Sequence, residues 1–208
     1  PQVEYTIAAL LCQAPFSIFP HPGKRAGDPR KKFAKSAAVL YTEPKDLSGK
    51  EMPMKILVLS DSHGAVSPME QAVEQTSPDL ILHLGDCWRD GERLHDRFPS
   101  IPLEQVPGNC DFRPTEPAER LLELRGKRIL LCHGHTYGVK QSLVTAGFAA
   151  EEQQLDLFLF GHTHRPLVDR RGRTLFLNPG SIGAPTRPSY GVVTIQDGQL
   201  DGRTWWLA

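Results

Sequence analysis

The sequence has no apolar run that approaches the roughly 20 residues required to cross a bilayer, so it predicts no transmembrane helix. It also lacks an excess of charge of either sign, because 24 basic residues balance 24 acidic ones. No global field would therefore attract a long nucleic acid or an anionic membrane surface. A chain of 208 residues can bury a sizeable core, which fits one globular domain with or without an appendage.

Cysteines are few, and their spacing excludes the common cysteine frameworks. The four residues, Cys12, Cys87, Cys110 and Cys132, form no CxxC pair and no dense set. This pattern is typical of a reduced compartment, so we expect a cytoplasmic protein in which Cys87 and Cys132 are small buried apolar residues. The short apolar stretch at residues 7–12 has no basic leader and does not predict secretion.

Residues 1–53 differ in character from the rest of the chain. They contain seven of the 18 prolines, eight basic and five acidic residues, and no sustained periodicity of a helix or a strand. At Met54 the pattern of a buried strand begins abruptly. We therefore predict a disordered or non-native N-terminal extension over residues 1–53 and one folded domain over residues 54–208.

From Met54 onward, short runs rich in Val, Ile, Leu and Phe alternate with helical segments. Strands are predicted at residues 56–60, 80–84, 101–106, 128–132, 157–160, 174–178 and 191–196, and helices at residues 67–75, 91–98 and 140–154. The early alternation indicates an α/β fold with a parallel or mixed sheet, and the last two strands suggest a hairpin.

Polar side chains that can bind metal ions follow five of these apolar runs. The segments read Asp61-Ser-His63, Gly85-Asp86, Gly108-Asn-Cys-Asp111, His133-Gly-His135 and Gly161-His-Thr-His164. Because ligands gather at the carboxyl ends of strands in an open sheet, we expect these side chains to converge. Oxygen and imidazole ligands with glycines beside them are what a site for two divalent cations requires. One such strand end would be incidental, whereas five in one chain indicate a metal centre.

In their order, spacing and strand context, these segments resemble the motifs of the calcineurin-like metallophosphoesterase superfamily. Gly-Asn-Cys-Asp111, Cys132-His-Gly-His135 and Asn178-Pro-Gly-Ser181 are also similar to its small single-domain subgroup of YfcE-type phosphodiesterases. The resemblance covers residues 54 to 187. It implies a four-layer α/β/β/α sandwich with two mixed β-sheets and a di-metal site at the C-terminal ends of the strands.

The resemblance also implies how the ligands are divided between two ions. The first ion would be held by Asp61, His63 and His164, the second by Asn109, His133 and His162, and Asp86 would bridge both. A metal-bridging hydroxide would then attack the phosphorus of a small phosphate ester. For this mixed set of ligands we expect two divalent transition-metal ions, manganese first, with nickel, cobalt, iron or zinc as alternatives.

One position departs from the broader superfamily. Many members carry a histidine directly after the motif asparagine, where it assists the leaving group or binds phosphate, whereas this chain has Cys110, as the YfcE-type subgroup does. A thiol is a weak hydrogen-bond donor. We therefore assign leaving-group assistance to His135 and count Asp86 and Asn109 with it as catalytic residues. The alternative is that His135 only hydrogen-bonds to a metal ligand.

Several other polar residues receive plainer interpretations. Arg165 and Arg187 are candidates for substrate binding, because guanidinium groups fit phosphate oxygens, and surface cations are the alternative. Asp111 is expected to orient a ligand or cap a turn. We expect Asp90 to lie at the surface or cap a helix, and His83 to pack within its strand.

Three functions are compatible with the sequence. The first is a metal-dependent phosphodiesterase that acts on a small diester, and the second is a phosphomonoesterase or nuclease with the same metal centre. The third is a non-catalytic scaffold, as in the retromer subunit that shares this fold. Because every ligand position is filled, an enzyme is favoured, and the balanced charge argues against a long nucleic-acid substrate. The sequence leaves open the natural substrate and whether the protein forms a homo-oligomer.

Overall fold

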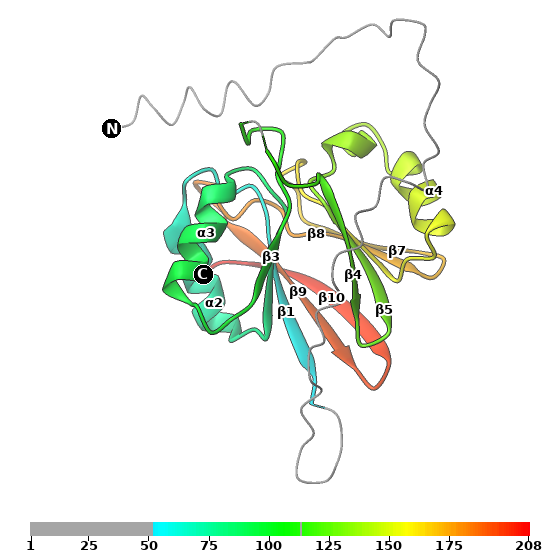
Figure 1. Ribbon diagram of the computed structural model, residues 1–208, viewed down its shortest axis with the longest axis horizontal. Coiled ribbons are helices and arrows are strands. Elements are labelled where there is room, and N and C mark those ends of the chain that lie inside the picture. Colours follow the sequence, from blue (N-terminus) through cyan, green and yellow to red (C-terminus); the bar gives the residue numbers. More distant parts are fainter. Residues whose placement is uncertain (1–51, 113) are drawn as a thin grey trace, which may run out of the picture. The chain divides into compact units, whose positions relative to one another are not determined.

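The computed structural model describes residues 52–112 and 114–208 (Figure 1). The prediction for residues 1–53 therefore lies almost entirely outside the described residues. The strands and helices are, in chain order, β1 (Met54–Leu59), α2 (Val66–Thr76), β2 (Leu80–His83), α3 (Trp88–Arg97), β3 (Leu103–Gln105), β4 (Glu119–Leu124), β5 (Lys127–Cys132), a short 3₁₀ helix (His135–Tyr137), α4 (Val144–Glu152), β6 (Leu157–Leu159), β7 (Leu167–Arg171), β8 (Thr174–Asn178), β9 (Ser189–Gln196) and β10 (Gln199–Trp206). No helix among the described residues is both long and apolar enough to span a membrane.

The strands form two mixed sheets of five strands each. Sheet one has the order β10-β9-β1-β2-β3, and sheet two has the order β4-β5-β6-β8-β7. In sheet one, β1, β2 and β3 are parallel, while β9 and β10 run antiparallel to their neighbours. In sheet two, β5, β6 and β8 are parallel, and the edge strands β4 and β7 are antiparallel.

Alternating residues of each central strand enter different parts of the core, as the period of two in a strand requires. In β1, Ile56 and Val58 join the apolar cluster that both sheets share, whereas Leu57 and Leu59 join the cluster beneath α2 and α3. The outer face of sheet two packs against α4, where Phe158 is the central aromatic side chain. The order is helices, sheet, sheet, helix, which confirms the predicted four-layer α/β/β/α sandwich.

The structure corrects the predicted hairpin between the strands at residues 174–178 and 191–196. These strands, β8 and β9, lie in different sheets, and β9 instead forms a hairpin with β10. Strands β4, β7 and β10 were not predicted, because their sequences mix charged residues with apolar ones. Four of the five residues of β7 are exposed, so its sequence lacks the apolar run of a buried strand.

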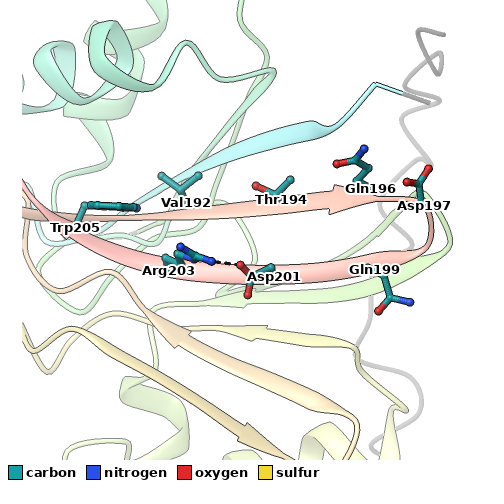
Figure 2. A pocket seen from close by; sticks show the side chains of 8 residues that line it. All are labelled: Val192, Thr194, Gln196, Asp197, Gln199, Asp201, Arg203 and Trp205. Atoms are coloured by element: carbon teal, nitrogen blue, oxygen red, sulfur yellow. Dashed lines mark hydrogen bonds and ion pairs between the residues drawn. The ribbon is translucent and has the colours of Figure 1, made fainter. Parts of the chain in front are cut away.

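The outer face of the β9–β10 hairpin carries a hollow of about 560 Å³ (Figure 2). It is lined by Val192, Thr194, Gln196, Asp197, Gln199, Asp201, Arg203 and Trp205. Arg203 pairs with Asp201 across 3.2 Å within it, and Trp205 is half exposed. None of the predicted metal ligands lines this hollow, so it is separate from the predicted centre.

The carboxyl ends of the two parallel strand sets meet at a point where the chains approach very closely. Gly161 follows β6 of sheet two and lies against the end of β1 in sheet one. A Cβ atom at this position would collide with Ser60 Oγ and would lie 2.8 Å from Asp61 Oδ2. Ser60 Oγ itself donates a 2.6 Å hydrogen bond to that carboxylate oxygen, so it cannot move away freely. Only glycine fits between the two sheets here.

We predict that Gly161→Ala lowers the free energy of unfolding by about 1–3 kcal/mol, because the added methyl group overpacks a buried contact. Urea unfolding of the metal-free protein measures this change. Gly147→Ala is the matched control, since Gly147 lies within α4 and an added Cβ meets no atom within 4 Å. The control should be neutral or stabilising by up to about 1 kcal/mol. Equal stability of the two variants would contradict the close approach.

His83, the last residue of β2, is completely buried beside the end of β1. Its Nε2 lies 3.3 Å from Ser62 Oγ, and its Nδ1 has no hydrogen-bond partner among the residues that the structure describes. Burial lowers the pKa of His83 below the usual histidine value, although Asp90 and Asp111 act in the opposite direction. The prediction that His83 packs within its strand is confirmed, and the native state holds the ring in its neutral form.

This burial predicts a pH dependence of stability in the metal-free protein. The unfolded chain takes up a proton at His83 as the pH falls below about 6.5, whereas the native state resists it. The free energy of unfolding should therefore decrease below that pH, with up to about 1.4 kcal/mol per pH unit from this residue. His83→Gln should reduce the slope, while His95→Gln, at an exposed position on α3, should not. Unfolding curves between pH 5 and 8 (roughly the range around the free histidine pKa) test this, and identical slopes would refute it.

Candidate metal centre

Each predicted ligand lies in a loop directly after a parallel strand. Asp61 and His63 follow β1, Asp86 follows β2, Asn109 follows β3, His133 follows β5, and His162 and His164 follow β6. Backbone hydrogen bonds join these loops, from Asp61 N to Gly85 O at 3.0 Å and from Gly161 N to His133 O at 3.0 Å. The two sheets thus bring the five polar segments together at one edge, as their positions after parallel strands predict.

The backbone at these loops is unusual. Five of the seven predicted ligands have a positive φ angle: Asp61 (55°), His63 (46°), Asp86 (59°), His162 (67°) and His164 (56°). Residues other than glycine adopt this left-handed region rarely, at a cost of order 1–3 kcal/mol each. Such conformations persist only where the surrounding structure holds them, and they cluster at functional sites.

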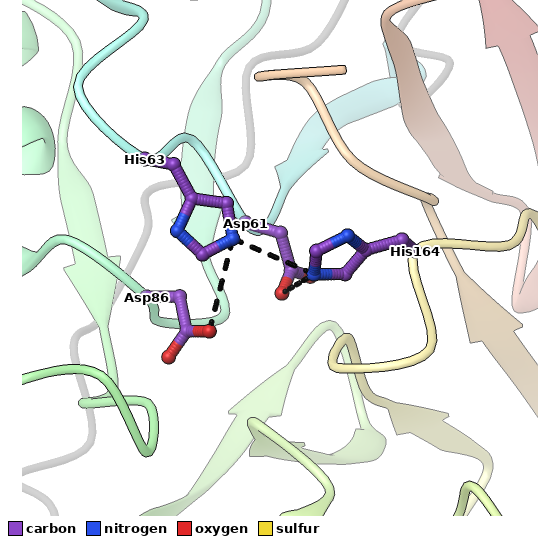
Figure 3. Close-up of side chains that lie close together, drawn as sticks. All are labelled: Asp61, His63, Asp86 and His164. Atoms are coloured by element: carbon purple, nitrogen blue, oxygen red, sulfur yellow. Dashed lines mark hydrogen bonds and ion pairs between the residues drawn. The ribbon is translucent and has the colours of Figure 1, made fainter. Parts of the chain in front are cut away.

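Four side chains form a close cluster in which the ligand atoms lie within 4.8 Å of one another (Figure 3). They are Asp61, His63, Asp86 and His164. His164 Nε2 lies 3.0 Å from Asp61 Oδ1 and 3.4 Å from His63 Nε2. His63 Nε2 lies 3.9 Å from Asp86 Oδ2. These contacts bring together the three predicted ligands of the first ion and the predicted bridging residue.

The donor atoms of this cluster fit a divalent cation. Two metal–ligand bonds of about 2.1 Å, at tetrahedral or octahedral angles, separate neighbouring donor atoms by about 3.0–3.4 Å. The distances from His164 Nε2 to Asp61 Oδ1 and to His63 Nε2 fall within that range. In addition, no group in residues 52–112 and 114–208 forms a hydrogen bond of good geometry with the buried Asp61 Oδ1. A buried carboxylate oxygen without a hydrogen bond is costly unless a cation lies beside it.

A second group of donor atoms lies on the other side of Asp86. His133 Nε2 is 3.1 Å from Asn109 Oδ1 and 3.4 Å from Asp86 Oδ1. The ring of His162 lies beside that of His133, with their centroids 5.0 Å apart. Asp86 therefore directs one carboxylate oxygen toward His63 and the other toward His133. This is the placement that a bridging ligand requires.

Hydrogen bonds and charges set the protonation of these ligands. His133 Nδ1 lies 2.8 Å from Leu84 O, so Nδ1 carries the proton and Nε2 is left as a ligand. Burial, followed by the nearby His133, lowers the pKa of His162 to about 3, which keeps it neutral and able to bind metal. Burial alone would raise the pKa of Asp61, but contact with His164 and the charge of His133 lower it far below its usual range. The same contact raises the pKa of His164.

Several residues outside the ligand set hold the loops in place. Asp111 accepts hydrogen bonds from the backbone N–H groups of Trp88 at 2.7 Å and Gly108 at 2.8 Å, in line with its predicted role as a turn cap. Asn178 Nδ2 donates to Gly161 O at 2.7 Å. Ser181 Oγ donates to Asp61 O at 2.8 Å. The turn after β8 thus supports two ligand loops.

The prediction that Asp90 lies at the surface or caps a helix is wrong. Asp90 is 2% exposed, and its carboxylate accepts hydrogen bonds from Ser62 and Gly64, not from its own helix. These hydrogen bonds join α3 to the loop after β1, and no local sequence pattern predicts that the two segments meet. Cys132 is buried as predicted, whereas Cys87 is only half-buried.

The remaining site predictions are placed as follows. His135 is close to the second group, with its ring centre 5.5 Å from that of His133, and its buried Nδ1 has no hydrogen-bond partner in the described part of the chain. Burial lowers the pKa of His135. Arg165 directly follows His164 and is exposed. Arg187 is also exposed, with its guanidinium carbon 4.1 Å from the ring centre of Trp206.

Relatives of known sequence share most of this domain. Residues 54–198 match the calcineurin-like phosphoesterase superfamily domain. The probable metallophosphoesterase YsnB of Bacillus subtilis (strain 168) is 35% identical over 150 residues, with 69% of this chain and 86% of that protein covered. Phosphodiesterase YfcE of Escherichia coli (strain K12) is 29% identical over 168 residues, with 67% of this chain and 87% of that protein covered.

Solved structures of other proteins have a similar fold. A predicted phosphoesterase from Streptococcus pneumoniae TIGR4 superposes with a TM-score of 0.64 at 29% identity, over 74% of this chain and 90% of that one. Vps29 of Entamoeba histolytica, solved with Zn²⁺, gives a TM-score of 0.55 at 20% identity, over 74% and 99% of the two chains, and shares the fold alone. Because the family model matches residues 54–198 and a relative is 35% identical, the chain belongs to the calcineurin-like phosphoesterase superfamily.

Proposed function

We propose that this protein is a metal-dependent phosphodiesterase that hydrolyses a small phosphate diester. The observation that carries the proposal is the position of Asp86, whose two carboxylate oxygens face two separate groups of ligand side chains. Two divalent ions held there would lower the pKa of a coordinated water and neutralise charge on the phosphoryl oxygens. The mixed oxygen and imidazole donors favour Mn²⁺, with nickel, cobalt, iron or zinc as alternatives.

The chain's own residues would then bind, orient and release the substrate. Asp61, His63 and His164 would hold one ion, and Asn109, His133 and His162 the other. Hydrolysis adds water across the bond between phosphorus and the leaving oxygen, and that oxygen requires a proton. His135 is the candidate donor, because it lies beside the second group without filling a ligand position. A bound phosphate anion would raise its lowered pKa and favour the donating form.

The exposed arginines are the candidates for holding the substrate. Arg165 follows the ligand His164 directly, so its guanidinium group can reach an anion at the edge of the centre. Arg187 is stacked on Trp206 and would need to leave that ring to contact phosphate. The balanced charge of the chain supports a small substrate and not a long nucleic acid.

The first test is hydrolysis of bis(p-nitrophenyl) phosphate and of p-nitrophenyl phosphate by metal-free protein resupplied with Mn²⁺. We expect metal-dependent release of nitrophenolate from the diester and much slower release from the monoester. Asp86→Ala should abolish the activity, because it removes the residue that faces both groups of ligands.

The controls separate the rival functions. Asp169→Ala changes a partly exposed acidic residue of β7, which pairs with Arg171 and is not among the predicted ligands, and should leave hydrolysis unchanged. Faster cleavage of the monoester would assign a phosphomonoesterase. A folded protein that shows no turnover with any transition metal would favour a scaffold, the function left open by the structural similarity to Vps29.

The role of His135 predicts a dependence on the leaving group. His135→Ala should slow hydrolysis of an alkyl phosphodiester by about 10²–10⁴-fold, the usual contribution of a general acid. The nitrophenyl ester should be slowed far less, because nitrophenolate departs without a proton. Rates of release for both esters at saturating Mn²⁺ measure the difference. An equal loss for the two esters would assign His135 to the support of a ligand instead.

A further inference from the structure

The buried carboxylate of Asp90 contacts the loop that carries His63 on both sides of that histidine. Asp90 lies in the first turn of α3 and is 2% exposed. Its Oδ2 accepts a hydrogen bond of 2.8 Å from Ser62 Oγ and one of 2.7 Å from the backbone N–H of Gly64. A single oxygen atom therefore binds the two residues that flank His63 in the sequence.

This loop has a conformation that needs outside support. Asp61, His63 and Gly64 have φ angles of 55°, 46° and 91°, so three of four consecutive residues occupy the left-handed region. The conformation is unfavourable at the first two, which are not glycine. The side chain of His63 is 26% exposed, and its Nε2 lies 3.4 Å from His164 Nε2 and 3.9 Å from Asp86 Oδ2. The direction of this ring depends on the backbone that Asp90 holds.

The same hydrogen bonds join two ligand loops. Ser62 Oγ is 2.8 Å from Asp90 Oδ2, 3.2 Å from Asp86 O and 3.3 Å from His83 Nε2. A hydroxyl group has one hydrogen, and the shortest contact places it on the Asp90 carboxylate. His83 then donates its Nε2–H to Ser62, and its neutral ring leaves Nδ1 unprotonated. Ser62 thus connects the loop after β1 to the strand that precedes Asp86.

The carboxylate is poorly compensated by charge. Among the residues that the structure describes, it pairs with one cation, Arg93, whose Nη1 lies 3.6 Å from Asp90 Oδ1 and whose side chain is 64% exposed. A buried carboxylate is stabilised mainly by the hydrogen bonds it accepts, and here they come from the ligand loop. Asp90 does not belong to the cluster of four side chains whose ligand atoms converge. The two hydrogen bonds that Asp90 accepts come from Ser62 and Gly64 of the loop.

We propose that Asp90 is a positioning residue that fixes His63 for the first metal ion by holding Ser62 and Gly64. The proposal rests on the metal centre of the proposed function. Loss of the carboxylate frees the left-handed loop, and His63 then leaves the position from which it faces Asp86 and His164. Outer residues of this kind change metal affinity by about 10–100-fold. The second group of ligands, Asn109, His133 and His162, lies in other loops, so its affinity for a metal ion should not change.

The test compares Asp90→Ala, Asp90→Asn and Thr174→Val. Asparagine keeps an acceptor oxygen and the shape of the side chain, so it is the conservative variant. Thr174→Val removes a buried 2.7 Å hydrogen bond to Leu155 O at the opposite end of β8 from the centre, and it controls for lost stability alone. Calorimetric titration of metal-free protein with Mn²⁺ gives the affinities, and NMR hydrogen exchange of the Gly64 amide reports on the loop without metal.

We expect Asp90→Ala to weaken one class of Mn²⁺ sites by about 10–100-fold and leave the other unchanged. Asp90→Asn should recover part of that loss, and Thr174→Val should bind Mn²⁺ as the unmodified chain does. High Mn²⁺ should restore turnover in Asp90→Ala, because all ligands remain present. The Gly64 amide should be protected in the unmodified chain and exchange rapidly in Asp90→Ala.

Two results would overturn the proposal. Unchanged Mn²⁺ affinity in Asp90→Ala would do so, as would equal losses in Asp90→Ala and Thr174→Val. If the unmodified chain bound no metal at all, the proposed function would fail instead, and the Gly64 exchange rate would still decide whether Asp90 holds the loop. The two failures are therefore distinguishable.

Discussion

The left-handed backbone at the metal-binding loops is the constraint on which the rest of the site depends. Asp61, His63, Asp86, His162 and His164 all have positive φ angles, each of them unfavourable for a residue other than glycine. The loops keep this conformation because two sheets packed on a common apolar core hold the strand ends together. Backbone hydrogen bonds between loops, and the side chains of Asp90, Asp111 and Ser181, supply the remaining support.

In the metal-free centre, Asp61 and His164 stabilise each other's charged forms, an interaction that a bound cation would replace. Contact with Asp61 raises the pKa of His164, while His164 and His133 lower the pKa of Asp61. Asp61 thus favours the protonated form of His164, whereas a histidine that binds a metal ion must be neutral. Metal binding therefore competes with protonation at His164, as expected wherever imidazole ligands must be neutral. His162 does not compete in this way, because burial lowers its pKa to about 3.

Much of the fold, and the convergence of Asp61, His63, Asp86 and His164, could be predicted from the sequence, because both depend on local patterns. Strands β1, β2, β5 and β6 are buried on both faces and appear as apolar runs, and each is followed directly by ligands. Strand β10 could not be predicted in this way. It is an edge strand with mostly exposed residues, and its sequence has neither an apolar run nor a regular alternation of polar and apolar residues. The role of Asp90 was also inaccessible, because it depends on a contact with Gly64, 26 residues away.

The pairing of β1 with β9 has a consequence for the order of assembly. β1 lies between β2 and β9 in sheet one, and Val58 is paired with Gly191, far along the chain. Loop closure over such a distance is entropically unfavourable until many other contacts have formed, so folds of this kind reach the native state slowly. The loop after β1 supplies Asp61 and His63, yet its strand gains its second neighbour only when β9 has been synthesised. During translation, the first ligands made are therefore among the last to be fixed in place.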